Sequence, residues 1–499
     1  MYRNPFDEKT EKYSKMFDTY FEHREVEKTK LLIKEVESNF GCFDDLSKAR
    51  LSYSLGTAYA DIMHLSQYNE ECLKKCIYYY SYSIEVLEKV EIKEENKPYI
   101  HPLMMNLYVN YGNALDYIGR ISSSIEYYKK ALKINEKNKM VLGNLNIAYM
   151  KYTIFLYDYG HRDFFNMEAY DGFKQLFNLT FSKEDSINKF AILKFEEYSK
   201  SFSKEYVNYL HTREYNIEIK KYEKHEQVYR QWASKNNLFL NPLNDLYKDL
   251  RVSYDIIHLP NMTAGLEEKP IYHGMYNQFK EEYIYLRFLF FEATENDRIV
   301  HYADKDNLLL ELDDLPLYSI RIEKMKTVFR QLYSMFDKIA YFINSYYRLG
   351  IPERKVNFKS IWKEEKIKRK LDIGENFMLN ALYWMSKEIY SCDNFSTNPL
   401  AEEIDIIRNH LEHKYVKIYS EGYGVNPNGE DDPLVRYISE EKLEKMTLYL
   451  MKLVKEIIIY LSLLVNIEEN QKEKRENIIE KRENIIEKRF DICRDEWKM

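Results

Sequence analysis

Apolar side chains recur at intervals of three and four residues through most of the chain, which is the period of a helix with one buried face. Alternating apolar and polar stretches, which predict strands, are sparse. With only 14 Gly and 11 Pro in 499 residues, the chain favours long helices joined by short connections. We therefore expect an all-α protein. The later half contains five helical runs whose lengths suit a bundle, at about residues 275–296, 316–349, 375–391, 400–420 and 437–470.

A repeated pattern runs through the first part of the chain. In residues 107–135, Gly112 and Ala114 lie on a predicted helix beside larger side chains, and a second amphipathic helix follows. Small residues let antiparallel helices approach closely, and the pattern starts again 34 residues later, with Asn146 in the position of Gly112. A degenerate copy with about eight inserted residues precedes it, at residues 53–87. The pattern resembles tetratricopeptide repeats, which implies a concave surface for a protein or peptide partner around Asn110, Asn113 and Asn144.

These signals divide the chain into three parts. We expect tetratricopeptide-like helical hairpins over residues 1–175, a charged helical connector over 176–230 and a helical bundle over 231–499. The bundle begins with an Asn, Pro and Asp cluster at 231–246, which predicts an ordered loop rather than a helix. The charged tail at 474–490 repeats seven residues in tandem. We interpret it as an extension of the last bundle helix, and a short coiled-coil contact is the alternative.

Composition excludes several classes of protein. The net charge is −7, so any contact with nucleic acid must come from a local basic patch. The five cysteines include no CxxC pair, which fits a reducing cytoplasm and argues against a disulfide scaffold. The N-terminus lacks the apolar core of a signal peptide. The most apolar run, 456–467, is shorter than the roughly 20 residues that span a bilayer, so we expect a buried helix, a cytoplasmic protein and no membrane contact.

The sequence DIIRNHLEHKYVKIY at 405–419 concentrates candidate chemistry on one amphipathic helix. Arg408 lies beside its apolar face, and Asn409 and His413 are four residues apart on the opposite, exposed side. Arg408 and Glu412 are also four apart and could form an ion pair. The expected apolar face consists of Ile404, Ile407, Leu411, Tyr415 and Ile418.

The stretch RNHLEH resembles the Arg-x4–6-His motif of the HEPN superfamily of helical-bundle ribonucleases. The resemblance makes Arg408 the motif arginine, Asn409 the polar residue that follows it and His413 the motif histidine. It covers about residues 230–470, where the segments 238–246, 258–262 and 271–292 also resemble a bacterial HEPN branch joined to tetratricopeptide-like helices. The alternative reading of the motif is a solvated helix face with an Arg408–Glu412 pair. A second match, Arg251 with His258, lacks the polar residue after the arginine.

The resemblance implies cleavage of RNA without a metal or cofactor, by attack of the 2′-OH on the adjacent phosphorus. His413 is suited to act as the base, and Arg408 can donate two parallel hydrogen bonds to phosphate. Asn409 could orient the His413 ring or bind phosphate, and His410 and Glu412 are possible helpers. Products would carry a 2′,3′-cyclic phosphate and a 5′-OH. Because Arg408 and His413 diverge by about 140° on a helix, and HEPN nucleases set two motifs face to face, we expect a homodimer.

Competing sites are weaker. His410 and His413 could contribute to a zinc site, but no third ligand follows at helical spacing, so we expect no metal. The Gly-rich stretch 422–429 predicts a loop beside the motif and not a phosphate cradle. The basic stretch 353–370, with Phe358 and Trp362 among its lysines, predicts either an RNA groove or a solvated charged helix. Its candidate RNA-binding residues are Lys363, Lys366, Lys368, Arg369 and Lys370.

Two functional hypotheses follow. The first is a metal-independent HEPN endoribonuclease that acts as a toxin-like or antiviral defence effector, whose repeats bind the trigger or a partner. The second is a non-catalytic tetratricopeptide scaffold, or a regulatory partner of another protein, whose HEPN-like bundle dimerises or binds nucleotide.

Overall fold

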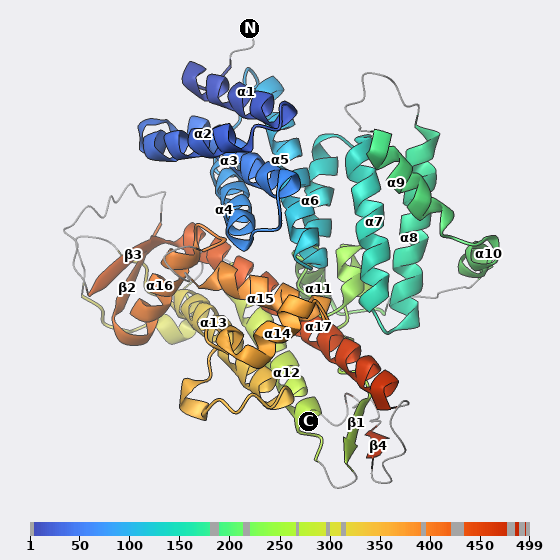
Figure 1. Ribbon diagram of the computed structural model, residues 1–499. Helices are drawn as coiled ribbons and strands as arrows, with labels where there is room; N and C mark the ends of the chain where they lie inside the picture. The colour runs from blue at the N-terminus through green and yellow to red at the C-terminus, as the bar shows by residue number, and fades with distance from the viewer. Residues whose placement is uncertain are drawn as a thin grey trace. The chain divides into compact units, whose positions relative to one another are not determined.

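The computed structural model describes residues 4–179, 189–212, 220–265, 269–295, 300–310, 316–390, 396–420, 434–476, 485–488 and 495 (Figure 1). The chain forms two compact units. The first contains Met1–Ile154, Tyr159–Tyr215 and Lys387–Glu402, and the second contains Phe155–Asp158, Asn216–Ser386 and Glu403–Met499. Residues 155–158 therefore belong to the second unit although the chain on either side belongs to the first, and residues 387–402 belong to the first unit although their sequence neighbours belong to the second. The fold is all-α, as predicted; the expected boundaries near residues 175 and 230 stay a prediction.

Helices of the first unit pair into hairpins. α3 packs on α4, and α5 packs on α6, as the blue and cyan ribbons in Figure 1 show. Side-chain caps begin several of these helices; the Asp44 carboxylate, for example, accepts a hydrogen bond from the Ser47 amide at 2.9 Å. The helices are α1 (Glu8–Glu22), α2 (Val26–Asn39), α3 (Asp45–Leu65), α4 (Glu70–Leu87), α5 (Lys97–Tyr117), α6 (Ile121–Ile134), α7 (Lys139–Phe155), α8 (Tyr159–Asn178), α9 (Lys189–Lys200) and α10 (Lys204–Thr212).

Glycines mark the close contacts inside two of these hairpins. A Cβ atom on Gly56 or on Gly112 would lie 2.7 Å from the ring of Tyr80 or Tyr128 on the neighbouring helix. Tyr80 follows its glycine eight residues later than Tyr128 follows Gly112, which corresponds to the insertion noted in the sequence. The helical hairpins are consistent with the repeat pattern, and the tetratricopeptide assignment itself stays a prediction.

The three asparagines of the expected partner surface lie on α5 and α7 and form two separate sets of hydrogen bonds. Asn110 of α5 donates to the Tyr53 hydroxyl of α3 at 3.3 Å. Asn144 of α7 donates to the Asn113 side-chain carbonyl at 2.9 Å, and the Tyr128 hydroxyl donates to the same oxygen at 2.8 Å. Asn113 and Asn144 therefore hold each other in place, and the role of all three asparagines in binding a partner stays a prediction.

The first unit also includes residues 387–402, which contain the last residues of α15 (Phe377–Ile389) and the first residues of α16 (Ala401–His413). Glu388 forms a buried salt bridge with Arg120, the residue before α6. Lys387 lies 2.8 Å from a carboxylate oxygen of Glu70 on α4. Two ion pairs thus attach this segment to the helical hairpins.

The second unit is the helical bundle. Its helices are α11 (Lys224–Lys235), α12 (Ile271–Thr294), α13 (Ile320–Tyr346), α14 (Glu365–Ile373), α15 (Phe377–Ile389), α16 (Ala401–His413) and α17 (Glu440–Glu476), of which α15 and α16 continue into residues 387–402. α12, α13 and α17 pack on one another. Every residue of α17 from Glu456 to Val465 is buried, so the most apolar run is a core helix, as predicted. Among the described helices, none combines the length and apolar character needed to cross a bilayer.

Short strands occur where the sequence predicts helix. The expected helix over 400–420 is wrong beyond His413, because β2 (Tyr415–Tyr419) pairs in parallel with β3 (Val435–Ser439). Val416 and Ile418 are buried and Tyr415 is exposed, which is the alternation of a strand. β-branched and aromatic residues fill this segment, and such residues favour a pleated surface.

The charged tail also departs from the helical prediction. α17 ends at Glu476, and Ile485–Lys488 form β4, antiparallel to β1 (Met262–Gly265). The remainder of the tail lies outside the described residues. A continuous helix over 474–490 is therefore wrong, because strand pairing with β1 supplies the backbone partners of residues 485–488.

The prediction of an ordered loop over 231–246 is wrong for residues 231–235, which belong to α11, and is confirmed for the Asn, Pro and Asp cluster that follows. Asn244 is fully buried; its side-chain carbonyl accepts from the Phe239 amide at 3.1 Å, and its amide group donates to the Ser234 carbonyl at 3.0 Å. Lys455 of α17 reaches a carboxylate oxygen of Asp245 at 3.2 Å, and both side chains are buried. The loop is thus attached to the core helix by a buried ion pair.

Candidate functional site

The motif occupies the last two turns of α16. Before the helix, the Asn398 side chain accepts a hydrogen bond from the Leu400 amide at 2.8 Å. Ile404 and Ile407 are fully buried, as predicted from the helical period. Arg408, Asn409 and His410 are half-buried, whereas Glu412 and His413 are exposed, and the helix ends at His413.

Arg408 is positioned by α13. Its guanidinium carbon lies 5.4 Å from the centre of the Tyr333 ring, and the Tyr333 hydroxyl donates to Asp405 at 3.1 Å. Arg408 Nη1 donates to the side-chain carbonyl of Asn409 at 2.9 Å. Among the described residues, Asn409 is the one hydrogen-bond acceptor that Arg408 contacts. Since a guanidinium carries five N–H donors, Arg408 retains donors for a bound anion.

The Arg408 charge also acts on Asp337 of α13. Burial raises the pKa of the Asp337 carboxyl above its ordinary value. The hydrogen bond from the Phe358 amide and the positive charge of Arg408 oppose this rise and only partly offset it. Arg408 of α16 therefore lies against the polar side chains of α13.

Asn409 and Glu412 have partners other than the expected ones. Asn409 contacts Arg408, and no described residue hydrogen-bonds the His413 ring. The Arg408–Glu412 pair does not form; instead Glu412 Oε1 lies 3.9 Å from Nε of Arg330 on α13. The alternative interpretation required an ion pair between Arg408 and Glu412. That pair is absent, because the tertiary packing places Arg330 beside Glu412 instead.

His410 has a defined tautomer. Its Nδ1 lies 2.8 Å from the Ile406 carbonyl oxygen, which can only accept, so Nδ1 carries the hydrogen. In the neutral ring Nε2 therefore holds a lone pair. His410 lines a cavity of about 150 Å³ between α13 and the junction of α16 with β2. The other lining residues are Glu323, Lys326, Thr327, Arg330, Leu411, Lys414, Tyr415 and Val416.

Sequence reasoning missed Lys326 and Arg330 in this cavity. With Tyr333 and Asp337 they follow one another at steps of four, three and four, so the helical period places all four on one face of α13. That spacing was available from the sequence. The contact of this face with α16, some 75 residues further along the chain, was not.

The basic stretch differs from the expected RNA groove. Phe358 and Trp362 are buried, so they offer no surface on which bases could stack. Lys370 lies 3.0 Å from Glu468 and 3.3 Å from Glu375, Lys368 lies 3.1 Å from Glu365, and Lys366 donates to the Tyr347 carbonyl. Lys363 and Arg369 are exposed, and contact of any of these five basic residues with RNA stays a prediction.

The other candidates bring no catalytic set together. Arg251 is paired with Asp249 at 2.7 Å, and His258 Nδ1 lies 2.7 Å from the Leu259 carbonyl oxygen, both outside any α-helix. Within the described ranges, no three His, Cys, Asp or Glu side chains are arranged to hold a metal ion. The Gly-rich stretch 422–429 lies outside the described residues.

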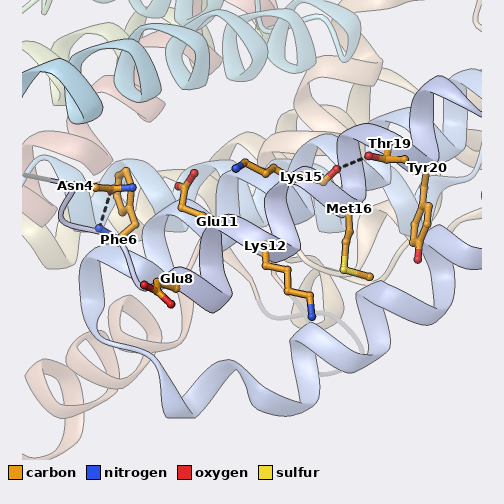
Figure 2. A pocket seen from close by; sticks show the side chains of 9 residues that line it. All are labelled: Asn4, Phe6, Glu8, Glu11, Lys12, Lys15, Met16, Thr19 and Tyr20. Atoms are coloured by element: carbon orange, nitrogen blue, oxygen red, sulfur yellow. Dashed lines mark hydrogen bonds between the residues drawn. The ribbon is translucent and has the colours of Figure 1, made fainter.

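A larger hollow of about 780 Å³ follows α1 in the first unit (Figure 2). One helix and the few residues before it make its wall, and its two glutamates balance its two lysines. It therefore presents no set of groups suited to RNA cleavage. Its lining residues are Asn4, Phe6, Glu8, Glu11, Lys12, Lys15, Met16, Thr19 and Tyr20.

Part of the bundle matches the model of a known protein family. Residues 263–468 match the family model of LA2681-like HEPN domains. The matched stretch runs from β1 into α17 and includes the whole motif on α16. Of the segments that suggested HEPN in the sequence, 271–292 lies inside the match, whereas 238–246 and 258–262 lie before it. No curated protein and no solved structure matches the chain. HEPN domains are generally ribonucleases, and a nucleotide-binding role is the other one that the match allows.

Proposed function

We propose that the HEPN-like bundle is a metal-independent endoribonuclease whose catalytic residues are Arg408, Asn409 and His413. The observation that supports this proposal most is the setting of Arg408. The Tyr333 ring and the Asn409 side chain hold its guanidinium in a half-buried place, five residues before an exposed histidine. A salt bridge on a solvated surface needs neither contact.

The reaction follows from the chemistry of these groups. A neutral histidine takes the proton of the ribose 2′-OH, and the 2′ oxygen attacks the adjacent phosphorus. The bond from phosphorus to the 5′ oxygen breaks, and that oxygen takes up a proton. Arg408 stabilises the negative charge that develops on the phosphoryl oxygens, and Asn409 keeps the guanidinium oriented. The products are a 2′,3′-cyclic phosphate and a 5′-OH.

The geometry of one helix favours a second copy. Arg408 and His413 are five residues apart and so diverge by about 140° around α16. Two bundles with their motifs face to face would let the arginine of one protomer and the histidine of its partner act on one phosphate. We therefore propose a homodimer through the bundle, with a protein or peptide partner on the helical hairpins and a role as a toxin-like or defence effector.

The alternative proposal is a scaffold whose HEPN-like bundle only dimerises or binds nucleotide. The family match allows it, because the nucleotide-binding role needs no histidine base. The two proposals differ in what they require of His413. An exposed ring with no catalytic role could be removed without consequence.

The test compares three purified full-length chains on total RNA in EDTA: wild type, His413→Ala and His225→Ala. His225 is an exposed histidine on α11 and serves as the matched control. We expect fragments that end in cyclic phosphate from the wild type and the control. General base catalysis contributes about 10²–10⁴-fold, so His413→Ala should lose at least about 100-fold in rate. Equal cleavage by His413→Ala, or cleavage that needs a divalent metal, would refute the proposal.

Circular dichroism of the three chains establishes that the variants are folded. The same chains expressed in cells separate toxicity from cleavage in vitro. Growth inhibition by the wild type and the control, together with normal growth on His413→Ala, is the outcome expected of a toxin-like effector.

A further inference from the structure

The cavity beside the motif has the position and size of a subsite. It lies between α13 and residues 410–416, which begin two residues after Arg408 and run from the end of α16 into β2. Its volume is about 150 Å³, which leaves room for a phosphate group. A chain of RNA that places one phosphate at Arg408 would bring a flanking phosphate close to this cavity.

The lining carries an excess of positive charge. Lys326, Arg330 and Lys414 contribute three cations, and Glu323 contributes one carboxylate, which pairs with Lys326 at 2.8 Å. Outside the lining, Glu412 forms an ion pair with Arg330 at 3.9 Å, which offsets part of this charge but is too long for a hydrogen bond. The planar guanidinium of Arg330 therefore keeps donors with which to hold a phosphate through two parallel hydrogen bonds.

The helix dipole accounts for only some of these charges. Cations in the last turn of a helix are stabilised by the helix dipole, which explains His410, His413 and Lys414 at the end of α16. Arg330 lies in the first half of α13, where the dipole offers a cation no such stabilisation. Positive groups from two helices thus meet at one cavity, and an anionic ligand explains both.

His410 also lines the cavity and can contribute a ring nitrogen to a ligand. Since its Nδ1 donates to the Ile406 carbonyl, Nε2 is the ring nitrogen left for a ligand. When protonated, it adds a further N–H donor for a phosphate oxygen. This assigns His410 to substrate binding rather than to proton transfer from the 2′-OH.

We propose that the cavity of Arg330, His410 and Lys414 binds a phosphate of the RNA backbone that flanks the cleaved one. The proposal rests on the proposed ribonuclease function. The ligand is a backbone phosphate, so the contact adds affinity without regard to base sequence.

The test measures binding separately from cleavage. The probe is a fluorescent 2′-O-methyl RNA oligonucleotide, which lacks the attacking hydroxyl and stays intact. Anisotropy titrations at several salt concentrations compare the full-length wild type with Arg330→Gln and Lys414→Gln. Lys338→Gln is the matched control, because Lys338 lies on the same helix and pairs with Glu282 at 2.7 Å, outside the cavity lining.

Each lost phosphate contact should change the salt dependence. For single strands the slope of log K against log salt is about −0.7 for each neutralised phosphate, so each cavity variant should be shallower by about 0.7. Affinity should fall several-fold, equally for oligonucleotides of different sequence. The control should keep the wild-type slope. The two cavity variants stand on different elements, so misfolding of one does not decide the outcome.

The failures of the two proposals are distinguishable. RNA cleavage that depends on His413, together with wild-type slopes for Arg330→Gln and Lys414→Gln, would overturn the subsite and leave the nuclease standing. A wild type that neither binds nor cleaves RNA would overturn the proposed function and the subsite with it. Binding of ATP, but not of RNA, that weakens in Arg330→Gln would overturn the RNA assignment in favour of a nucleotide phosphate.

Discussion

Arg287 of α12 joins the loop before the bundle to the bundle core. Its side chain is 2% exposed, and two of its nitrogens each donate to an oxygen of Asp255 at 2.7 Å. It also donates to the Leu238 carbonyl at 3.0 Å, and to the Tyr229 hydroxyl at 2.8 Å. Asp255 in turn accepts from the Leu240 amide at 2.7 Å. One ion pair thus connects α11, the loop and α12.

Arg287→Met removes these four donors but keeps most of the apolar stem. The Asp255 carboxylate then stays buried without its cation, and breaking a buried pair on one side costs about 3–5 kcal/mol. With a urea dependence of about 3 kcal/mol/M, the unfolding midpoint should fall by about 1 M or more. Asp255→Asn should cost a similar amount. The double variant should cost at least about 2 kcal/mol less than the sum of the two, because no buried charge is left unpaired.

Tryptophan fluorescence reports the second unit alone. All four tryptophans of the chain, Trp232, Trp362, Trp384 and Trp497, belong to that unit, and the residues of the first unit include no tryptophan. Urea titrations of the four chains therefore measure the bundle without interference from the hairpins. A midpoint shift below about 0.3 M for Arg287→Met, or additive costs in the double variant, would refute the reasoning.

The same pair predicts a pH dependence. Burial raises the pKa of Asp255, but the charge and hydrogen bonds of Arg287 outweigh it, so the folded pKa lies below the ordinary value. A lowered carboxyl pKa contributes stability that is complete above the unfolded pKa of about 3.9 and is lost as the pH falls through the folded pKa. The difference between the wild type and Arg287→Met should therefore be largest at neutral pH and shrink below about pH 4. An unchanged difference at pH 3 would contradict this assignment.

Two further predictions concern stability. Gly112→Ala places a Cβ atom 2.7 Å from the Tyr128 ring and should lower the free energy of unfolding by about 1–3 kcal/mol. Gly274 lies on α12, and a Cβ atom there would meet no atom within 4 Å, so Gly274→Ala should raise the free energy of unfolding by about 0.5–1 kcal/mol. Thermal unfolding followed by circular dichroism checks both, and equal shifts would contradict the close contact. Burial and the nearby Asp18 raise the pKa of Asp61 to about 7, so the folded state holds an extra proton between about pH 4 and 7 and loses stability as the pH rises through that range. Asp61→Asn should therefore gain at least about 1 kcal/mol at pH 8 and nothing at pH 4, by urea titration with circular dichroism; a gain at both would indicate another cause.

The sequence by itself determined the helical elements. The period of the apolar residues and the length of each run located α12, α13, α15 and α17 to within a few residues. The buried face of a long helix depends on the local spacing of apolar residues, which the sequence shows directly. The same spacing predicted the buried run in α17 and the close contact between helices at Gly112. The motif on α16 was readable for the same reason, since Arg408, Asn409 and His413 lie within two turns of one helix.

Tertiary structure alone decided what these residues contact. α16 ends at His413 because Tyr415–Tyr419 pair with a strand 20 residues further along, and no local window contains that partner. The companions of Arg408 and Glu412 are Tyr333 and Arg330, which come from a helix about 75 residues earlier. Local propensity acts within one or two turns of the chain, whereas the cavity, its charge and the setting of the motif arginine arise where separate helices pack.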